Sequence, residues 1–468
     1  MKNNLQRNIE GAINWAKVQG AEFADARWGA GKGIAIEVQD GRLEKVHATS
    51  SEGVGIRVLM GGSWGFASAN GADKRQVERC VRDALAMAKA SIGRQTEHGI
   101  VAETQPFTGT AKTEPLIHPD DVPMEAKINK AVYFEEKARK YDERVTNTQL
   151  TYRDGSGESL VMNTFGTCVR TATVRTFAAV RVVAADGGQR QRAFEIVGRR
   201  GGFEVIEELD ASHFSEAASS RAIRLLAAEP PPSGSFPVIF DPSIAGLLVH
   251  EAFGHNAEAD HVWSGESIIA GKFGEQVASP LVTIVDDPTL AGAWGSYDYD
   301  SEGTPAQRRV LIENGVVVGF LNSLETAAQL GMQPNGAARC ENHHYRPIVR
   351  MSNTFFAPGA ATLDEMIKKI DTGIMVGKAL GGYVATEKGQ FTCRAGESWL
   401  IRNGQKEKLL RDVAVSGLTL EALRKVEAVS SDFSLSMPGT CGKLGQGVPV
   451  DDGGPYILIS ELVVGGQS

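Results

Sequence analysis

Cysteine is scarce in this chain of 468 residues, which has five scattered thiols and no CxxC pair. An odd number of well-separated cysteines argues against a disulfide framework, and reduced thiols are typical of the cytoplasm. The N-terminus lacks the continuous apolar core of a signal peptide, and no apolar run approaches the ~18 residues needed to span a bilayer. We therefore expect a cytoplasmic protein that makes no contact with a membrane.

An excess of basic charge is also absent, because the formal net charge is -8. Domains that bind nucleic acids usually carry a basic surface, so we expect no nucleic-acid partner. The chain is too long for one ordinary domain, and at least two domains are expected.

The first half of the chain alternates between helical and strand patterns. Apolar residues at helical spacing predict helices at 5–20, 72–91, 123–141 and 215–228. Alternating runs around Asp40-Gly41 and Gly61-Gly62 predict hairpins, and the stretch from 145 to about 197 is rich in strands. This half is therefore expected to be an α+β domain with a mixed sheet and flanking helices.

A Pro/Ser/Gly cluster, EPPPSGSFP at 229–237, interrupts these patterns. Three prolines cannot continue a helix, so we place a domain junction there. The sequence that follows is mostly strand-like, with Asn-Gly turns at 314–315 and 403–404. The expected fold class is α+β, with an N-terminal domain over residues 1–230 and a β-rich C-terminal domain over 236–468.

The stretch VHEAFGHNAEAD at 249–260 resembles the zinc-binding helix of metalloproteases, but the spacing differs. That helix has H-E-x-x-H, whereas His250 and His255 are five residues apart. On an ideal helix a five-residue step leaves the two imidazoles about 140° apart, at ~3.6 residues per turn. A metal site therefore requires either a π-turn or a helix that ends at Gly254 and lets His255 fold back.

Two interpretations of this stretch remain open from the residues alone. In the first, His250 and His255 bind zinc and Glu251 is the general base that deprotonates a zinc-activated water. In the second, the two histidines simply flank a helix end. The helix itself has a good start, with Asp241 as the N-cap and Pro242 in the first turn.

A catalytic zinc site needs a third protein ligand, and several residues are candidates. Cys441 lies in the glycine-rich stretch PGTCGKLGQGVPV, which we expect to be a loop that presents one thiolate; alternatively, Cys441 is a small buried core residue. Glu258 either supports His255 or is a solvated carboxylate. The remaining candidates are His261, His343, His344, Asp260 and the other cysteines.

Four segments together resemble the TldD/PmbA family of peptidases, in particular its metal-bearing TldD type. They are HEAFGHNAEAD at 250–260, YDYDSEGTPAQRRVLIENGVVVGFL at 297–321, RPIVRMSNTFFAPG at 346–359 and GTCGKLGQGVPV at 439–450. The pairing of H-E-x-x-x-H with a distant G-x-C-G-K-x-G-Q-G is highly specific, and the likeness extends over most of the chain.

The resemblance implies that His250, His255 and Cys441 hold Zn²⁺ in the C-terminal domain and that Glu251 is the catalytic base. It also implies a zinc-dependent metalloprotease that cleaves short or unfolded peptides. Such a protein is expected to be the catalytic subunit of a dimer, either with itself or with a related PmbA/TldE-type subunit that lacks the motif. We expect extended peptides to bind by adding a strand to a sheet edge, and Arg350 and Asn353 are candidates for the substrate groove.

Two other functions compete with this hypothesis. A zinc deaminase requires H-x-E with P-C-x-x-C, and neither spacing occurs here. A non-catalytic regulatory protein of the DNA gyrase modulator type, with a structural metal, remains the alternative. A structural zinc has four protein ligands and no base, so Glu251 favours the enzyme.

Overall fold

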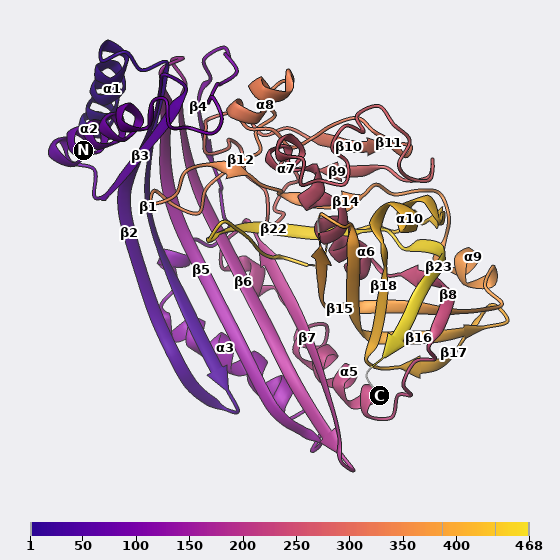
Figure 1. Ribbon diagram of the computed structural model, residues 1–468. Helices are drawn as coiled ribbons and strands as arrows, with labels where there is room; N and C mark the ends of the chain where they lie inside the picture. Colours follow the sequence, from indigo (N-terminus) through magenta and orange to yellow (C-terminus); the bar gives the residue numbers. More distant parts are fainter. Residues whose placement is uncertain (1, 386, 436, 467–468) are drawn as a thin grey trace.

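The computed structural model describes residues 2–385, 387–435 and 437–466. Its N-terminal half is built on one mixed sheet of long, bent strands (Figure 1), in the order β3-β2-β1-β5-β6-β4, with β7 also paired to β6. The strands are β1 (Phe23–Gln39), β2 (Arg42–Met60), β3 (Ser63–Asn70), β4 (Thr108–Lys112), β5 (Val145–Asn163), β6 (Cys168–Asp186) and β7 (Gln189–Arg199).

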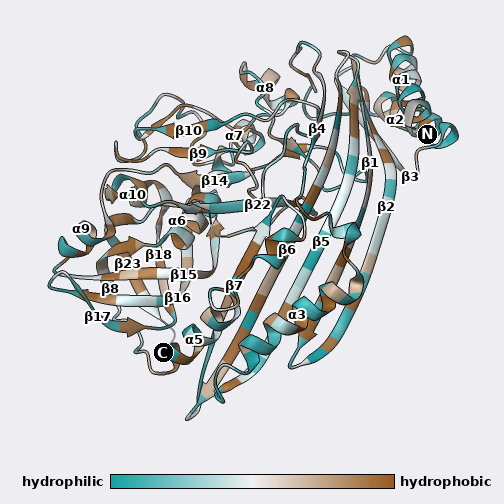
Figure 2. Ribbon diagram, turned by 180° about the vertical axis from the view of Figure 1, so that it is seen from behind, coloured by the Kyte–Doolittle hydropathy of each residue, from teal (hydrophilic) through white to brown (hydrophobic). Residues whose placement is uncertain are grey.

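Helices cover one face of this N-terminal sheet. Even-numbered strand residues such as Trp28 and Leu160 pack under α1 and α2, while Tyr152 and Val180 pack under α3 and α5. Figure 2 shows α3 lying across that face. The helices are α1 (Lys2–Val18), α2 (Lys74–Ser91), α3 (Met124–Arg139), the short α4 (Glu204–Glu207) and α5 (Ser215–Leu226). The opposite face, which carries the odd-numbered residues of β1, β2, β5 and β6, looks toward the C-terminal half.

The C-terminal half contains a closed ring of strands. β15, β8, β23, β18 and β16 each pair with the next, and β16 pairs back with β15. β17 extends this ring beside β16, and β19 pairs with β23. The strands are β8 (Gly234–Phe240), β15 (Thr372–Ala385), β16 (Gln390–Arg402), β17 (Gln405–Leu410), β18 (Val413–Leu418), β19 (Val426–Val429) and β23 (Ile457–Gly466).

A second C-terminal sheet runs in the order β11-β10-β9-β14-β22-β20, and β21 pairs with β22. Its strands are β9 (Ile284–Asp286), β10 (Arg309–Glu313), β11 (Val316–Val317), β14 (Asn353–Phe356), β20 (Ser434–Leu435), β21 (Gly439–Lys443) and β22 (Gln446–Gly454). The pair β12 (Ala338–Arg339) and β13 (Ile348–Val349) lies apart from it. The remaining helices are α6 (Pro242–Leu248), α7 (Ala259–Ser264), α8 (Leu324–Leu330), α9 (Leu363–Lys368) and α10 (Thr419–Arg424).

The fold class and the turns expected from the sequence are confirmed. Asp40-Gly41, Gly61-Gly62, Asn314-Gly315 and Asn403-Gly404 each join two paired strands, and all eight residues have positive φ. That geometry matches the twist of a tight hairpin. Among the described residues, no helix is long and apolar enough to cross a membrane.

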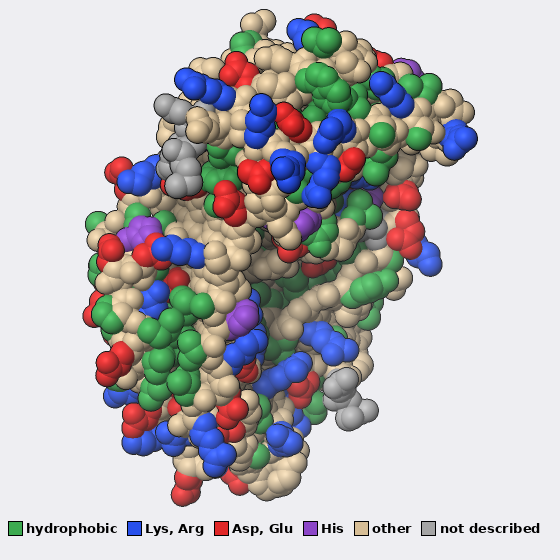
Figure 3. All heavy atoms as spheres, turned by 90° about the vertical axis from the view of Figure 1, so that its left-hand side faces the viewer, with side chains coloured by type: hydrophobic (Ala, Val, Ile, Leu, Met, Phe, Trp, Pro, Cys, Tyr) green, Lys and Arg blue, Asp and Glu red, His purple; other side chains and the backbone are tan. Residues whose placement is uncertain are grey.

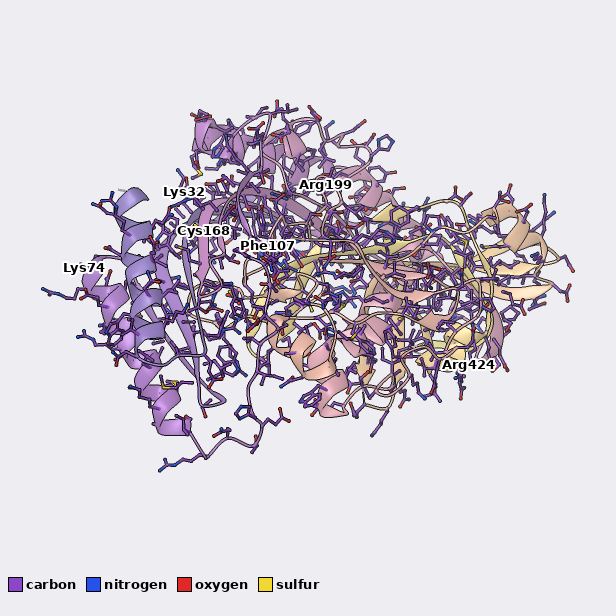
Figure 4. The ribbon with its side chains drawn as sticks, turned by 90° about the horizontal axis from the view of Figure 1, so that it is seen from above. Lys32, Lys74, Phe107, Cys168, Arg199 and Arg424 are labelled. Atoms are coloured by element: carbon purple, nitrogen blue, oxygen red, sulfur yellow. The ribbon has the colours of Figure 1, made fainter. Side chains whose placement is uncertain are left out.

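The two halves lie side by side along the long axis of the molecule. Seen from above (Figure 4), Lys74 of α2 lies at one end, Arg424 of α10 at the other, and Arg199 of β7 between them. The face in Figure 3 is hollowed near its middle, between an upper and a lower part. α6 packs among β14, β15 and β22, so the helix that carries the histidine motif begins deep within the C-terminal half.

Candidate metal centre

A change of helix type brings the two histidines together. The Asp241 side chain caps α6 by accepting a hydrogen bond from the Ile244 N–H, and α6 continues as a π-helix over Val249–Gly254. A π-turn holds more residues than an α-turn, so a five-residue step rotates less far beyond one full turn. The ring centroids of His250 and His255 are 5.2 Å apart. The π-turn, one of the two geometries that the spacing required, is therefore present, and Gly254 keeps helical angles.

A β-hairpin brings Cys441 to the same place. Cys441 lies on β21, which pairs with β22, and its Sγ atom is 3.6 Å from Nε2 of His255. One ligand atom from each of His250, His255 and Cys441 lies within 4.8 Å of the others. The expected loop at 439–447 is thus a pair of strands joined by Leu444-Gly445, both with positive φ. The absence of Asn or Asp from that turn hid the hairpin in the sequence.

Two buried carboxylates fix the histidine rings. Oδ1 of Asp452 is 2.8 Å from Nδ1 of His250, and Oε2 of Glu258 is 3.0 Å from Nδ1 of His255. A carboxylate at Nδ1 holds the proton there, so that Nε2 can act as a ligand. Glu258 is fully buried, so it supports His255 and is not the solvated carboxylate that the sequence left open.

The charges of this cluster are strongly coupled. Burial raises the pKa of Cys441, but hydrogen bonds with His250 and His255 lower it further, to about 5. Burial lowers the pKa of His255, but the charge of Glu258, followed by the bond with Cys441, raises it to about 9. The cluster thus favours a thiolate beside an imidazolium, and a thiolate is the form of cysteine that binds metals.

Glu251 lies next to this cluster and differs from the other carboxylates there. Its side chain is half-buried, and within the described part of the chain it has no hydrogen-bond partner. Burial and the charge of Glu251 raise the pKa of Cys393 to about 12, which places Glu251 close to β16 as well. A carboxylate with free oxygens is able to accept a proton from water.

Lys443 compensates the charge of a neighbouring acidic cluster. Glu258, Asp260 and His261 also lie within ligand distance of one another. The Lys443 ammonium group donates to Glu258 at 3.1 Å and to Asp260 at 2.6 and 2.7 Å. A cation already compensates these carboxylates, and it also ties the Cys441 hairpin to the helix that follows His255.

Several residues singled out in the sequence lie elsewhere. His343 and His344 contact Asn70 and Ser68 of the N-terminal sheet, away from the cluster. The expectation that Arg350 and Asn353 line a substrate groove is wrong, because both are fully buried. Arg350 donates to the backbone carbonyls of Cys441 and Gln446, and so holds the hairpin in place.

Asn353 has a similar structural role. Its amide donates to the Asp287 carbonyl at 2.6 Å and to the Ser296 hydroxyl at 2.8 Å, and so anchors the loop between β9 and β10. Sequence reasoning missed Asp452 entirely, because an acidic residue far from the histidine motif carries no local signal. Lys443 lies in the quoted glycine-rich motif, but its partners are set by tertiary contacts.

Two imidazoles and one thiol are a donor set typical of zinc centres, so the cluster defines a candidate metalloprotein. Three family models match the chain. They describe PmbA/TldA metallopeptidase domain 1 at residues 24–88, the central domain at 117–226 and the C-terminal domain at 233–466. The chain belongs to the PmbA/TldD family of metallopeptidases.

Its relatives carry names of the same kind. A Metalloprotease of Methanothermobacter thermautotrophicus is 40% identical over 445 residues, which cover 95% of this chain and 96% of the relative. A Metalloprotease TldD homolog of Haemophilus influenzae is 31% identical and covers 96% and 93%. A Zinc metalloprotease TldD homolog of Saccharolobus solfataricus is 26% identical and covers 97% and 99%.

Solved structures share the fold. TldE from Thermococcus kodakarensis superposes with a TM-score of 0.80 at 20% identity, covering 98% of this chain and 100% of that one. A Thermotoga maritima protein, proposed as a modulator of a DNA gyrase, superposes with a TM-score of 0.80 at 23% identity, covering 98% and 99%. At these identities the likeness extends to the fold alone.

Proposed function

We propose that this chain is a zinc-dependent metallopeptidase that cleaves short or unfolded peptides. In this proposal His250, His255 and Cys441 hold the ion, and Glu251 is the general base. The observation that carries it is the cluster itself: three ligand atoms within 4.8 Å of one another, with a carboxylate beside them that has no hydrogen-bond partner within the described residues.

The residues present fit a zinc ion. Two imidazoles and one thiolate are ordinary zinc ligands, and three protein ligands leave one coordination position for water or substrate. The Nδ1 atoms of both histidines are engaged by carboxylates, which is the usual support of a metal-binding imidazole. When bound, zinc supplies Lewis acidity, which polarises a peptide carbonyl and makes water easier to deprotonate.

The chain's own residues supply the remaining chemistry in this proposal. Glu251 accepts the proton of the attacking water and later gives it to the leaving amine, as a general base and acid in turn. Asp452 and Glu258 keep the two imidazoles in position throughout. Arg350, which binds the carbonyl of Cys441, keeps the thiolate aligned with them.

We also infer the setting of this activity. We propose a dimer, either of two copies or with a TldE-type partner, as membership of the family implies. The described residues contain five free cysteines, which supports a cytoplasmic location. We keep the proposed domains at 1–230 and 236–468, with the proline-rich junction between them. Strand addition at a sheet edge remains our prediction for substrate binding.

Metal analysis tests the proposed ligands. We expect about one zinc per chain in the wild type and a sharp loss in Cys441→Ser, because a serine hydroxyl is a poor zinc ligand at neutral pH. Elemental mass spectrometry of the purified proteins measures both. The matched control is Cys340→Ser, since Cys340 lies outside the cluster and should keep its zinc. Full zinc in both variants would show that Cys441 is not a ligand.

Peptidase assays test the base. Glu251→Gln keeps the size of the side chain and removes its basicity, so we expect zinc to remain while turnover falls by about 100-fold or more. Full peptidase activity in this variant would rule out the proposed role. Zinc without peptidase activity in the wild type would favour the regulatory alternative.

A further inference from the structure

A cavity of about 620 Å³ lies between the N-terminal sheet and the C-terminal half. Strands β1, β2, β5 and β6 line one side. The loop at 297–301, residues 339–343 and residues 447–449 of β22 line the other. Val448 pairs directly with Cys441, so the cavity borders the hairpin that carries the candidate thiolate ligand.

Glycines of two neighbouring strands form much of the floor of this cavity, so that main chain is exposed there. Gly29, Gly31 and Gly33 of β1 lie on its side of the sheet, and β5 sets Gly157 opposite Gly31 and Gly155 opposite Gly33. None of the five has a positive φ, so the backbone there does not require glycine. Glycine within a strand weakens it, and it often marks a place where a ligand or another backbone approaches closely.

Packing requires only one of these glycines outright. A Cβ atom on Gly29 would meet nothing within 4 Å, and on Gly31 or Gly155 it would make ordinary contacts of 3.4 Å with the neighbouring strand. On Gly157 the contact would be tighter, at 3.2 Å, and on Gly33 a Cβ atom would lie 2.9 Å from the Asp154 carbonyl. By contrast, a Cβ atom on Gly53 or Gly55 would lie 2.2 or 2.4 Å from atoms of His343. Close contact therefore explains Gly33 and the glycines of β2, whereas Gly29, Gly31 and Gly155 leave room for a side chain.

Two arginines without carboxylate partners line the same cavity. Arg175 donates to the carbonyls of Trp294 and Ser296, at 3.1 and 2.7 Å. Arg339 donates to the Met351 carbonyl at 2.7 Å and stacks over the Tyr297 ring. Neither arginine forms an ion pair with any residue in the described ranges.

Two acidic residues that line the cavity, Asp300 and Glu341, accept hydrogen bonds from backbone N–H groups. Asp300 accepts from the N–H groups of Glu302, Thr304 and Ala338, and Glu341 accepts from that of Gly447. Burial, and next the charge of Arg339, lower the pKa of Arg175 to about 9. No carboxylate of the described residues forms an ion pair with either arginine, and the nearby Asp298 and Asp286 are themselves paired with Arg200 and Arg309.

We propose that this cavity binds the C-terminal carboxylate of an extended peptide. Arg175 and Arg339 bind the carboxylate, and the glycine floor accommodates the preceding main chain beside the Cys441 hairpin. This inference rests on the proposed peptidase function, because it names the part of the substrate that the enzyme recognises. It predicts a preference for peptides with a free C-terminus.

The test compares labelled short peptides that differ only at the C-terminus. Binding to the full chain is measured by fluorescence anisotropy, with a chelator present so that no peptide is cleaved. We expect the free acid to bind about tenfold more tightly than the C-terminal amide, as for a hydrogen bond to a charged group. Equal affinities in the wild type overturn the proposal.

A third peptide distinguishes a terminal from a side-chain carboxylate. It carries an internal glutamate and an amidated end, and we expect it to bind as weakly as the simple amide. Binding as tight as that of the free acid overturns the claim for the C-terminus.

Variants test the residues. Arg175→Gln should abolish the preference for the acid. The control is Arg170→Gln, on the opposite face of the same strand, where Arg170 contacts Gln6; it should keep the preference. Gly29→Leu should weaken binding of the acid without lowering the melting temperature, because a Cβ atom there meets nothing within 4 Å. A lower melting temperature with unchanged binding would show that the glycines serve the bend of the sheet, and retention of the preference in Arg175→Gln would exclude that arginine.

Zinc content and peptidase activity are measured on the same preparations. A preference for the acid in a protein without peptidase activity would refute the proposed function and leave the carboxylate site standing. Equal affinities in an active peptidase would refute the carboxylate site alone.

Discussion

At the scale of single residues, Asp452 supports the candidate metal centre although it lies outside the sequence motifs that predicted the centre. It lies on β22, is buried, and holds Nδ1 of His250 at 2.8 Å. Its neighbour Asp451 points elsewhere, toward the Trp294 N–H at 3.5 Å. Two adjacent aspartates on one strand thus have different roles, because successive side chains point to opposite faces.

We predict that Asp452→Asn lowers zinc affinity by about 10–100-fold, the usual effect of losing a carboxylate behind a metal-binding histidine. Competition with a fluorescent zinc chelator measures the affinity. Asp451→Asn is the matched control and should bind zinc like the wild type. Equal losses in the two variants would mean that Asp452 acts through general stability.

Glu204 gives a prediction of pH dependence. Its carboxylate accepts from the N–H groups of Gly202 and Ile117, at 2.7 and 2.9 Å. Burial raises the pKa of Glu204, but these backbone hydrogen bonds lower it further, below the ordinary value of 4.5. A carboxylate with a lowered folded pKa stabilises the fold above its unfolded pKa, and this contribution is lost as pH falls through the folded value.

Glu204→Gln should therefore melt at a lower temperature than the wild type at neutral pH, and the gap should close as the pH falls below about 4.5. Calorimetry across this range measures the gap. Glu207→Gln, in the same short helix, is the control, because its carboxylate is half exposed and should show a smaller gap. A gap that stays constant into acid would contradict the prediction.

At the scale of elements, the hairpin of β21 and β22 has an unusual turn. Leu444 has a φ of 49° and is 71% exposed, and Gly445 follows with a φ of 74°. A two-residue hairpin turn with both φ values positive is a type I′ turn, which favours asparagine in its first central position. A leucine there is strained by its Cβ atom and gains nothing from burial.

Leu444→Asn should therefore stabilise the protein by about 1 kcal/mol, because asparagine tolerates the left-handed region. The midpoint of urea unfolding measures the change. Leu444→Val is the contrasting variant and should destabilise, since a β-branched residue suits positive φ least. If both substitutions shift the midpoint in the same direction, turn strain is not the cause.

At the scale of the whole molecule, one buried ion network joins the two halves. Arg57 of β2 binds Asp25 of β1 and also Glu302 from the C-terminal half, each at 2.6 Å. The second oxygen of Glu302 accepts from the Leu324 N–H at 2.7 Å. All three charged side chains are at most 5% exposed, so water cannot replace a lost partner.

Glu302→Gln should destabilise the protein by about 3 kcal/mol, because removing one partner leaves a buried charge less well compensated. Urea unfolding measures the loss, and zinc content should stay unchanged. Glu461→Gln is the control, since its ion pair with Lys425 is exposed and should contribute nothing measurable. A loss confined to zinc binding, with no change in stability, would contradict a structural role.

Local chemistry determined what the sequence predicted correctly. The turns at Asp40-Gly41 and Asn403-Gly404 follow from residues that tolerate positive φ, whatever surrounds them. A metal site with the five-residue step from His250 to His255 required either a π-turn or a helix end at Gly254, because rotation per residue is fixed by backbone geometry, and the structure has the π-helix. The α+β class followed from apolar periodicity, which is also local.

Tertiary structure decided the rest. Asp452, Lys443 and Arg350 act on the cluster from strands and loops far along the chain, and no local pattern distinguishes them from other polar residues. Arg350 looked like a surface ligand but is buried, because exposure depends on what packs over a residue and not on its type. The closed ring of strands and the cavity between the halves likewise exist only once distant strands pair, since pairing partners are chosen by the packing of the whole molecule.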